Sequence, residues 1–198
     1  MSKKELIINV ASKHFSEYGY ERASLDVVAK EVGVTKPAIY YHFKDKYALY
    51  EAVLCSKFSA LLERMQSVYE VEEPKDALRA YVETFGNFLL EHPCFAAMFA
   101  RELADGAKNI PQSCTKSLSQ ILKLLSTILL KGEEEGVFGK ENPFMIQLMI
   151  VSTLINYKTT KKLREGVVMN LADIKNIDIE LKDIIKNLAN KIVKAVQC

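Results

Sequence analysis

Apolar residues recur every three or four positions along almost the whole chain, which is the spacing of one face of an α-helix. Residues 3–18 place Ile7, Val10 and Phe15 on one side of such a helix, and Gly19 supplies the left-handed conformation that commonly ends one. No stretch combines sustained alternation of apolar and polar residues with hairpin turns. The pattern therefore predicts an all-α fold.

Two short amphipathic segments follow the first helix. Ser24 is a natural N-cap for the first of them, and Gly33 ends it. Thr35 then caps the next segment, in which Pro37 lies in the first turn, where its missing N–H costs nothing. Three helices, the last two joined by a tight glycine turn, are thus expected within the first 46 residues.

A long fourth helix is expected next, with Asp45 as its cap and apolar residues at helical spacing to about Val68. About 23 residues at about 1.5 Å rise make a rod of roughly 35 Å, which can begin in one domain and end in another. We therefore expect two domains, residues 1–46 and residues 47–198. Five more helices bring the expected number to about nine: Pro74 to Pro93, Pro93 to Gly106, Gln112 to Lys131, Asn142 to Leu163 and Asp178 to Val196, with residues 166–177 as a connection.

The composition is that of an ordinary globular chain, because 49% of the 198 residues are apolar and 26% are charged. The first 46 residues carry eight Lys or Arg and six Asp or Glu, and the rest carries 19 of each. This small basic excess permits nucleic-acid binding without establishing it. The N-terminus is too polar for a signal peptide, and the most apolar run, residues 144–157, contains polar side chains and is too short to span a bilayer. A cytoplasmic protein without membrane contact is expected.

The side chains left exposed on the third helix suit a DNA surface. Its apolar Ile39 and Phe43 point inward, and the rest of the helix carries lysines, tyrosines and small residues. Lysines and hydroxyl groups can reach phosphate oxygens, whereas Pro37 and Ala38 let the helix approach base edges closely. The two adjacent tyrosines have no core to fill, and contact with a sugar–phosphate backbone explains them.

Residues 5–50 resemble the DNA-binding head of the tetracycline-repressor (TetR) family of bacterial regulators. The resemblance rests on one ordered run: Phe15, Gly19-Tyr20, Ser24, Val28-Ala29, Gly33-Val34-Thr35, Tyr40-Tyr41-His42-Phe43, Lys44, Lys46 and Leu49. It implies a helix-turn-helix whose recognition helix, residues 35–42, lies in the major groove of a palindromic operator in double-stranded DNA. The base edges would be contacted by Lys36, Pro37, Ala38 and Tyr40, and the phosphates by Ser24, Thr35, Tyr41, His42 and Lys46. A helix-end hydrogen bond explains His42 equally well, and Asp26 places an acid where a neutral or basic residue would suit DNA better.

The rest of the chain resembles the family in outline. In this family the C-terminal domain is a helical bundle that dimerises through its last two long helices and holds a pocket for a small-molecule inducer, so a homodimer is expected. The apolar faces of these helices fit an interface made by Ile146, Ile150, Leu154, Leu181, Ile184, Ile185, Leu188 and Ile192. The predicted pocket residues are Phe85, Phe88, Phe95, Met98, Phe99, Met145 and Tyr157. They favour an apolar or amphipathic inducer, although such residues also suit a plain core.

The leading hypothesis is a repressor that an inducer releases from its operator. The alternative is a DNA-bound adaptor whose C-terminal domain binds a protein partner. An enzyme is disfavoured because the chain has no Gly-rich phosphate loop and no GxSxG motif, and no catalytic residue, cofactor or metal is predicted. The four cysteines lack metal-ligand spacing and are expected to be idle thiols in a reducing cytosol, with a redox switch through Cys94 and Cys114 as the alternative.

Overall fold

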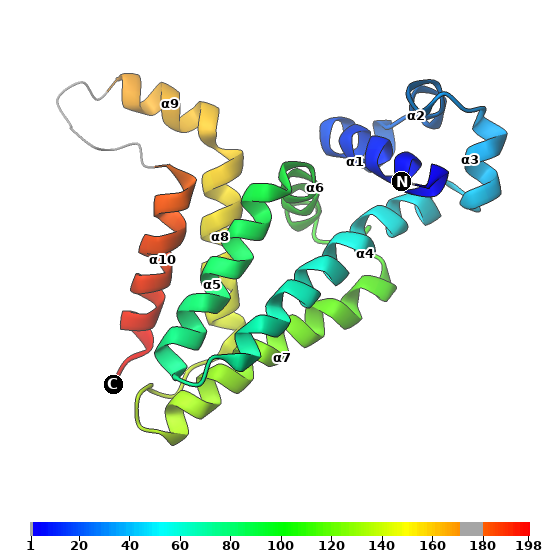
Figure 1. The fold of residues 1–198 in the computed structure, drawn as a ribbon. Coiled ribbons are helices and arrows are strands. Elements are labelled where there is room, and N and C mark those ends of the chain that lie inside the picture. The colour runs from blue at the N-terminus through cyan, green and yellow to red at the C-terminus, as the bar shows by residue number, and fades with distance from the viewer. Residues whose placement is uncertain (1, 171–179) are drawn as a thin grey trace. The chain divides into compact units, whose positions relative to one another are not determined.

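The computed structural model describes residues 2–170 and 180–198. Within these residues the chain forms ten α-helices and one short 3-10 helix (Figure 1), which confirms the predicted all-α fold. The elements are α1 (Lys3–Arg22), α2 (Leu25–Val32), α3 (Lys36–His42), α4 (Lys46–Met65), η1 (Gln66–Glu70), α5 (Pro74–Glu91), α6 (Pro93–Ala104), α7 (Gln112–Glu134), α8 (Pro143–Thr159), α9 (Lys161–Met169) and α10 (Leu181–Val196). No helix in this part of the chain is both long and apolar enough to cross a membrane.

The turn and cap residues act largely where the sequence predicts them. Gly19 has a positive φ of 75° and bends α1, which then continues for one short turn instead of stopping there. The Asp45 carboxylate accepts a hydrogen bond from the Ala48 N–H at 2.8 Å, and the Asn142 side chain accepts one from the Phe144 N–H at 2.9 Å. These bonds satisfy N–H groups that the first turn of a helix leaves unpaired.

Helix α9 and the 3-10 helix η1 are the elements that the sequence pattern does not predict, since the fourth helix was expected to run to about Val68 and α4 ends at Met65. The pattern predicted one helix from Asn142 to Leu163, but α8 ends at Thr159. Thr160 follows it with φ −93° and ψ 17°, which departs from helical geometry, and its hydroxyl donates to the Asn156 carbonyl at 2.6 Å. Residues 166–169, predicted as connection, belong to α9. The remainder of the predicted connection and the predicted helix start at Asp178 lie among residues 171–179, outside the described residues.

Residue contacts divide the chain into two compact units. The first unit comprises residues 1–60 and 92–118, and therefore contains α1, α2, α3, α6 and parts of α4 and α7. Within it α1 packs against α6 as well as α2. Its core includes Ile7, Phe15, Leu49, Leu54 and Phe58, each at most 1% exposed. The predicted boundary at residue 46 stays a prediction.

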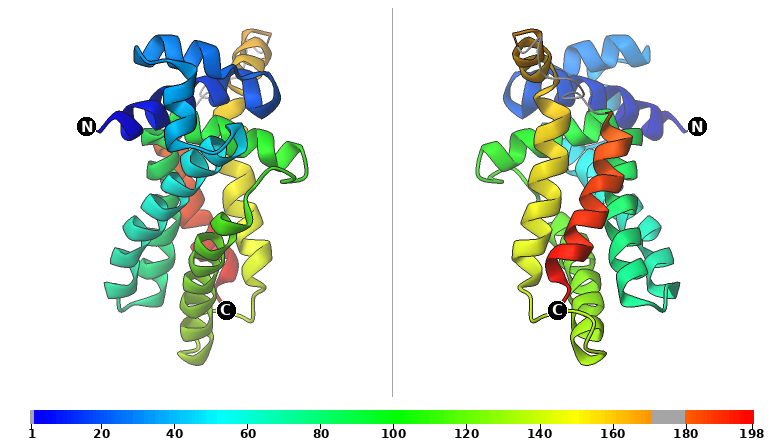
Figure 2. Two further views of the ribbon diagram at one scale, coloured as in Figure 1. Left: turned by 90° about the vertical axis from the view of Figure 1, so that its right-hand side faces the viewer. Right: turned by 90° about the vertical axis from the view of Figure 1, so that its left-hand side faces the viewer.

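The second unit comprises residues 61–91 and 119–198. Helices α5, α8 and α10 lie side by side in it, as both views of Figure 2 show together with Figure 1. Gly86 allows α5 and α10 to approach closely, because a Cβ atom there would lie 2.7 Å from the Ile185 side chain. Tyr81 is completely buried between these elements and donates a hydrogen bond to the Gln147 side chain of α8 at 2.6 Å.

Candidate nucleic-acid interface and ligand-binding surfaces

Helices α2 and α3 form a helix-turn-helix around Gly33. This residue ends α2 in the left-handed conformation, with φ 73° and ψ 40°, and its N–H donates to carbonyls of the last turn. Thr35 is extended, with φ −85° and ψ 155°, and starts α3. Val28, Ala29 and Ile39 are buried and fix the two helices against each other. The outward face of α3 is thereby fixed as well.

The outward face carries hydroxyl groups that the helices themselves do not use. Ser24 and Thr35 occupy the N-cap positions of α2 and α3, and neither side chain makes the usual capping hydrogen bond. Tyr41 is 86% exposed and Tyr40 is 44% exposed. Pro37 is also exposed. Hydroxyl groups in such positions can donate to phosphate oxygens of DNA.

Lys36, predicted to contact a base edge, is paired within the head. Its Nζ atom lies 2.8 Å from the Asp26 carboxylate of α2, and both side chains are exposed. The hydrogen bond to Asp26 raises the pKa of Lys36, so the lysine keeps its charge. Base contact therefore requires Lys36 to leave Asp26. Ala38 and His42 of the same helix are half-buried, and the His42 ring contacts its neighbours Tyr41 and Phe43.

Lys46, predicted to contact a phosphate, has partners inside the protein. Its Nζ atom donates to the Glu21 carbonyl at 2.9 Å and lies 5.1 Å from the centre of the Tyr20 ring. Burial lowers the pKa of Lys46, with the charge of Glu21 opposing that effect. The side chain thus ties the end of α1 to the start of α4. The phosphate contact of Lys46 stays a prediction.

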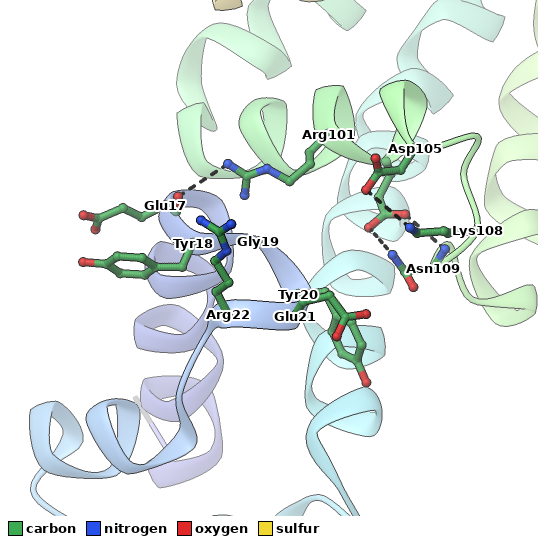
Figure 3. Close-up of a pocket in the computed structure, with 11 residues that line it drawn as sticks. Glu17, Tyr18, Gly19, Tyr20, Glu21, Arg22, Arg101, Asp105, Lys108 and Asn109 are labelled. Carbon is green, nitrogen blue, oxygen red and sulfur yellow. Dashed lines mark hydrogen bonds and ion pairs between the residues drawn. The ribbon is translucent and has the colours of Figure 1, made fainter.

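The first unit has a polar hollow of about 360 Å³ between the end of α1 and the end of α6 (Figure 3). Arg101 donates to the carbonyls of Phe15 and Glu17 at 3.1 and 3.4 Å. Beside it Glu102 is only 2% exposed. The carboxylate of Glu102 accepts hydrogen bonds from the Tyr50 hydroxyl at 2.5 Å and from the Asn109 backbone N–H at 3.1 Å.

The Tyr50–Glu102 bond belongs to a buried network that the helical pattern of the sequence does not predict. Burial and the bond to Glu102 raise the pKa of Tyr50 well above that of an ordinary tyrosine. The sequence carried a signal for it, since Glu102 follows the buried Phe99 by one helical spacing of three. The structure places the Glu102 side chain in the core of the first unit.

The second unit has a basic hollow of about 440 Å³ at the end of α8. It is lined by Leu90, Tyr157, Lys158, Lys161, Arg164 and residues 180–182. The Arg164 guanidinium stacks 3.5 Å from the centre of the Tyr157 ring and donates to the Tyr157 carbonyl at 2.9 Å. Four of the lining side chains are cationic and one, Glu180, is anionic. Such a surface suits an anion attached to an apolar group.

The seven predicted pocket residues are distributed over both units. Three of them, Phe95, Met98 and Phe99, are buried in the first unit, where the Phe95 and Phe99 rings make edge contacts with Phe58 at 5.1 and 5.4 Å between centres. The other four lie in the second unit: Phe85 and Phe88 are buried, Tyr157 lines the basic hollow, and Met145 is 60% exposed. The exposure of Met145 differs from the prediction, because this side chain points away from the core.

The predicted dimer interface also needs correction in part. Five of its eight residues are at most 2% exposed and therefore form the core of a single chain, where no partner can touch them: Ile146, Ile150, Leu154, Ile185 and Ile192. Leu181, Ile184 and Leu188 are half-exposed. The apolar residues that α8 leaves in solvent are Phe144, Met145, Leu148 and Met149, between 37% and 66% exposed. The sequence shows two apolar faces on α8, and its pattern alone does not say which one is covered.

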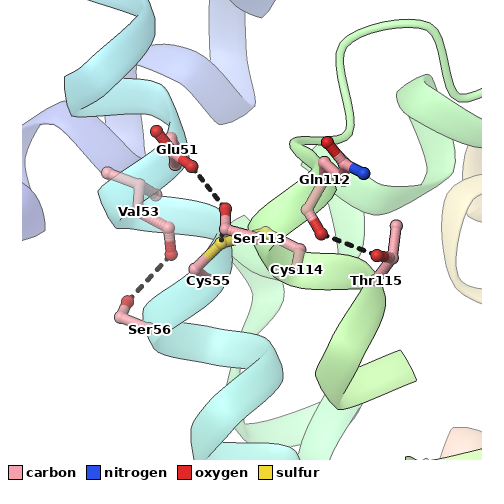
Figure 4. The surroundings of a disulfide bond; sticks show 8 residues. All are labelled: Glu51, Val53, Cys55, Ser56, Gln112, Ser113, Cys114 and Thr115. Carbon is pink, nitrogen blue, oxygen red and sulfur yellow. Dashed lines mark hydrogen bonds between the residues drawn. A yellow bond between two sulfur atoms is a disulfide. The ribbon is translucent and has the colours of Figure 1, made fainter. Parts of the chain in front are cut away.

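Two of the four cysteines form a disulfide, contrary to the expectation of idle thiols. It joins Cys55 of α4 to Cys114 of α7, with their Cα atoms 5.0 Å apart (Figure 4). Cys94 and Cys198 are free. The alternative pairing of Cys94 with Cys114 is therefore wrong. The bonded residues are 59 positions apart, so no local motif could have revealed the pair.

Comparison with known proteins assigns this helix-turn-helix protein to a family of DNA-binding regulators. Residues 7–53 match the family described as bacterial regulatory proteins, tetR family, and residues 74–175 match the tetracyclin repressor-like C-terminal domain. The second match alone covers more than half of the chain. The chain therefore belongs to the TetR family of helix-turn-helix transcriptional regulators, whose members bind operator DNA and small-molecule ligands and are not enzymes.

Individual relatives are distant but extend over most of the chain. The HTH-type transcriptional regulator RutR of Escherichia coli K12 is 25% identical over 156 residues, which cover 79% of this chain and 74% of RutR. The HTH-type transcriptional activator FasR of Mycolicibacterium smegmatis is 37% identical over 87 residues, or 43% of this chain and 39% of FasR.

Solved structures share the whole fold. FadR from Bacillus subtilis, crystallised with stearoyl-CoA, has a TM-score of 0.75 and 22% identity, with 98% of this chain and 99% of FadR covered. The regulator PfmR from Thermus thermophilus has a TM-score of 0.71 and 23% identity, with 95% of this chain and 97% of PfmR covered. At this level of identity the likeness shows the fold.

Proposed function

We propose that this regulator is a homodimeric repressor that binds a palindromic operator in the cytoplasm, where the DNA is, and is released from it by a small amphipathic ligand. The observation that carries the proposal is the outward face of α2 and α3. There the hydroxyls of Ser24 and Thr35 make no capping bond. Helix α3 has small residues in its first turn and exposes Tyr40 and Tyr41 at its end. This combination suits phosphate contacts around a helix in the major groove.

A homodimer follows from the small size of one recognition surface. One short helix reads few base pairs, whereas two heads related by a two-fold axis read two half-sites about 34–36 Å apart. The exposed apolar face of α8 is the proposed site of the second copy. Phe144 and Leu148 are 66% and 64% exposed one helical turn apart, and contiguous exposed apolar residues of this kind mark interaction surfaces.

The ligand is proposed to be an anionic amphipath, such as a long-chain fatty acyl-CoA thioester, whose phosphates carry the negative charge. The basic hollow of the second unit combines the positive charge of Lys158, Lys161 and Arg164 with the apolar surface of Leu90 and Tyr157. Lys158 and Arg164 are held there by bonds to the Leu89 and Tyr157 carbonyls. The buried Phe85 and Phe88 remain candidates to contact the apolar tail. The similarly folded FadR from B. subtilis was crystallised with stearoyl-CoA, which supports this class of ligand.

Operator binding and release can be measured with the full chain. The operator is first identified by selection from random duplex DNA, and its affinity is then measured by fluorescence anisotropy with and without stearoyl-CoA. A ligand that prefers the released state should weaken operator binding by roughly 5–150-fold. Failure to select any palindromic sequence would contradict the repressor proposal.

The ligand site is tested with a pair of neighbouring variants. Lys161→Ala removes a cation from the hollow, whereas Lys162→Ala removes an exposed cation of the same helix that does not line it. We expect the first variant to need more stearoyl-CoA for release and the second to respond like the original protein. If both variants respond unchanged, the ligand binds elsewhere. If neither acyl thioesters nor free fatty acids act on the original protein, the adaptor that binds a protein partner becomes the better hypothesis.

A further inference from the structure

We propose that Cys55 and Cys114 form a reversible oxidation site, through which hydroperoxides weaken operator binding. The two residues belong to the same compact unit as the helix-turn-helix. Cys55 lies on α4, nine residues after its first residue, and Cys114 lies in the first turn of α7. The inference uses the proposed operator binding as its functional readout.

The geometry of the pair allows one sulfur to react first. The Cα atoms are 5.0 Å apart, within the range in which a disulfide closes without backbone movement. Cys114 is only 1% exposed, whereas Cys55 is partly exposed and its sulfur lies 3.2 Å from the Ser113 hydroxyl. Cys55 is therefore the sulfur that an oxidant can reach, and Cys114 is held next to it as the resolving partner.

The reducing environment of the cytosol favours a reversible, regulatory disulfide over a permanent structural one. A protein that binds operator DNA works in the bacterial cytosol, where thiols are kept reduced and disulfides that do form are mostly transient, catalytic or redox-sensing. A pair of cysteines that two helices hold at bonding distance is then reduced in the resting cell. Cys94 and Cys198 have no partner sulfur in the described residues and provide an internal comparison.

The proposed oxidant is a hydroperoxide, and the reaction balances in two steps. The Cys55 thiolate attacks the terminal peroxide oxygen, the O–O bond breaks, and the departing alkoxide takes up a proton to leave as an alcohol, or as water from hydrogen peroxide. The Cys114 thiol then attacks the sulfur of the Cys55 sulfenic acid, and its proton leaves with the hydroxyl group as water. The two sulfurs together lose two electrons, and the peroxide gains them. Exchange with a cellular dithiol restores both thiols.

The bond acts on the head through α4. Cys55 is about 14 Å along this helix from Lys46, which directly follows the helix-turn-helix. A disulfide between α4 and α7 holds α4 in one arrangement. It therefore restricts the movements by which the two heads of a dimer adjust to two half-sites. Because the repressor acts in a reducing cytosol, we expect the form without the disulfide to bind the operator more tightly.

The test compares reduced and peroxide-treated full-length protein. Mass spectrometry should show a Cys55–Cys114 peptide after treatment with hydrogen peroxide and its loss after dithiothreitol. Closing a loop of this length should raise the melting temperature by about 5–15 °C. The operator Kd should rise at least about fivefold on oxidation. Cys55→Ser should abolish all three changes, and the matched variant Cys94→Ser should keep them.

The outcomes separate this inference from the proposed function. Reduced protein that binds no operator would contradict the proposed function. If the reduced protein binds its operator and the verified disulfide leaves the Kd unchanged or lowers it, the redox proposal alone is overturned. Peroxide treatment that joins other cysteines would overturn it as well. Because Cys55→Ser can disturb folding, its circular dichroism and melting temperature are compared with those of the reduced original protein, and Cys114→Ala provides a second variant without the bond.

Discussion

At the level of single residues, the pair of Asp26 and Lys36 sets the charge that the head presents to DNA. The carboxylate faces the same surface as the recognition helix and holds the lysine at 2.8 Å. We expect Asp26→Asn to tighten operator binding roughly threefold or more at low salt, because it removes a charge that repels phosphates and frees Lys36. The gain should shrink as the salt concentration rises. Anisotropy titrations at several salt concentrations measure both effects.

A matched control is available in the second unit. Asp76 is also exposed and forms an ion pair with an arginine, Arg79, but it lies on α5 and not on the helix-turn-helix. Asp76→Asn makes the same change of charge and should leave the operator Kd nearly unaltered. Equal effects of the two variants would mean that only the net charge matters, and that Asp26 does not act through the recognition surface.

The sequence predicted which residues of the head are exposed more successfully than what they contact. Helical spacing and the turn glycine place Tyr40 and Tyr41 outside and Ile39 inside, and the structure agrees. The bond of Lys36 to Asp26 spans ten positions and that of Lys46 to the Glu21 carbonyl spans 25. Such contacts depend on how the helices pack after the turn, which the periodicity of one helix does not determine.

At the level of elements, the close packing of α5 against α10 depends on Gly86. Alanine favours a helix over glycine by about 1 kcal/mol, but a Cβ atom at position 86 would lie within 3.0 Å of three atoms of the buried Ile185 side chain. Overpacking a core costs about 1–3 kcal/mol, so the steric term should win. We expect Gly86→Ala to lower the free energy of unfolding by about 1 kcal/mol, measured by denaturant titration.

The glycine of α9 serves as the control for this effect. Gly166 is also helical, but a Cβ atom there meets no other atom within 4 Å. Gly166→Ala should therefore leave the protein unchanged or slightly more stable, since only the helix preference acts. If both variants are more stable than the original protein, the contact between α5 and α10 can accommodate a methyl group at position 86, and the steric argument is wrong.

The helices themselves were largely predictable, and the exceptions have local causes. Proline and capping residues marked the starts of α5, α6 and α8 correctly, because they act within one turn of the chain. The break between α8 and α9 is not marked by a glycine or proline: it lies at Thr160, whose ψ of 17° departs from that of a helix. The Cys55–Cys114 bond was missed because it joins distant helices.

At the level of the whole molecule, the proposed homodimer depends on the apolar face of α8 that a single chain leaves exposed. We expect Leu148→Glu to convert the dimer to a monomer at micromolar concentration, because it places a charge in the centre of the exposed apolar row. Light scattering coupled to size-exclusion chromatography measures the mass. The operator Kd should rise roughly a hundredfold or more, since the second head then binds as a separate molecule.

The control for the dimer variant is Leu130→Glu. Leu130 lies on α7, is 54% exposed and receives the same substitution, so the two variants make the same change at similar exposure on different helices. We expect Leu130→Glu to remain dimeric and to bind the operator normally. If Leu148→Glu also remains a dimer while keeping its helical content and melting temperature, the α8 face is not the interface. The predicted interface residues of α10 that are half-exposed, such as Leu188, would then be the next surface to change.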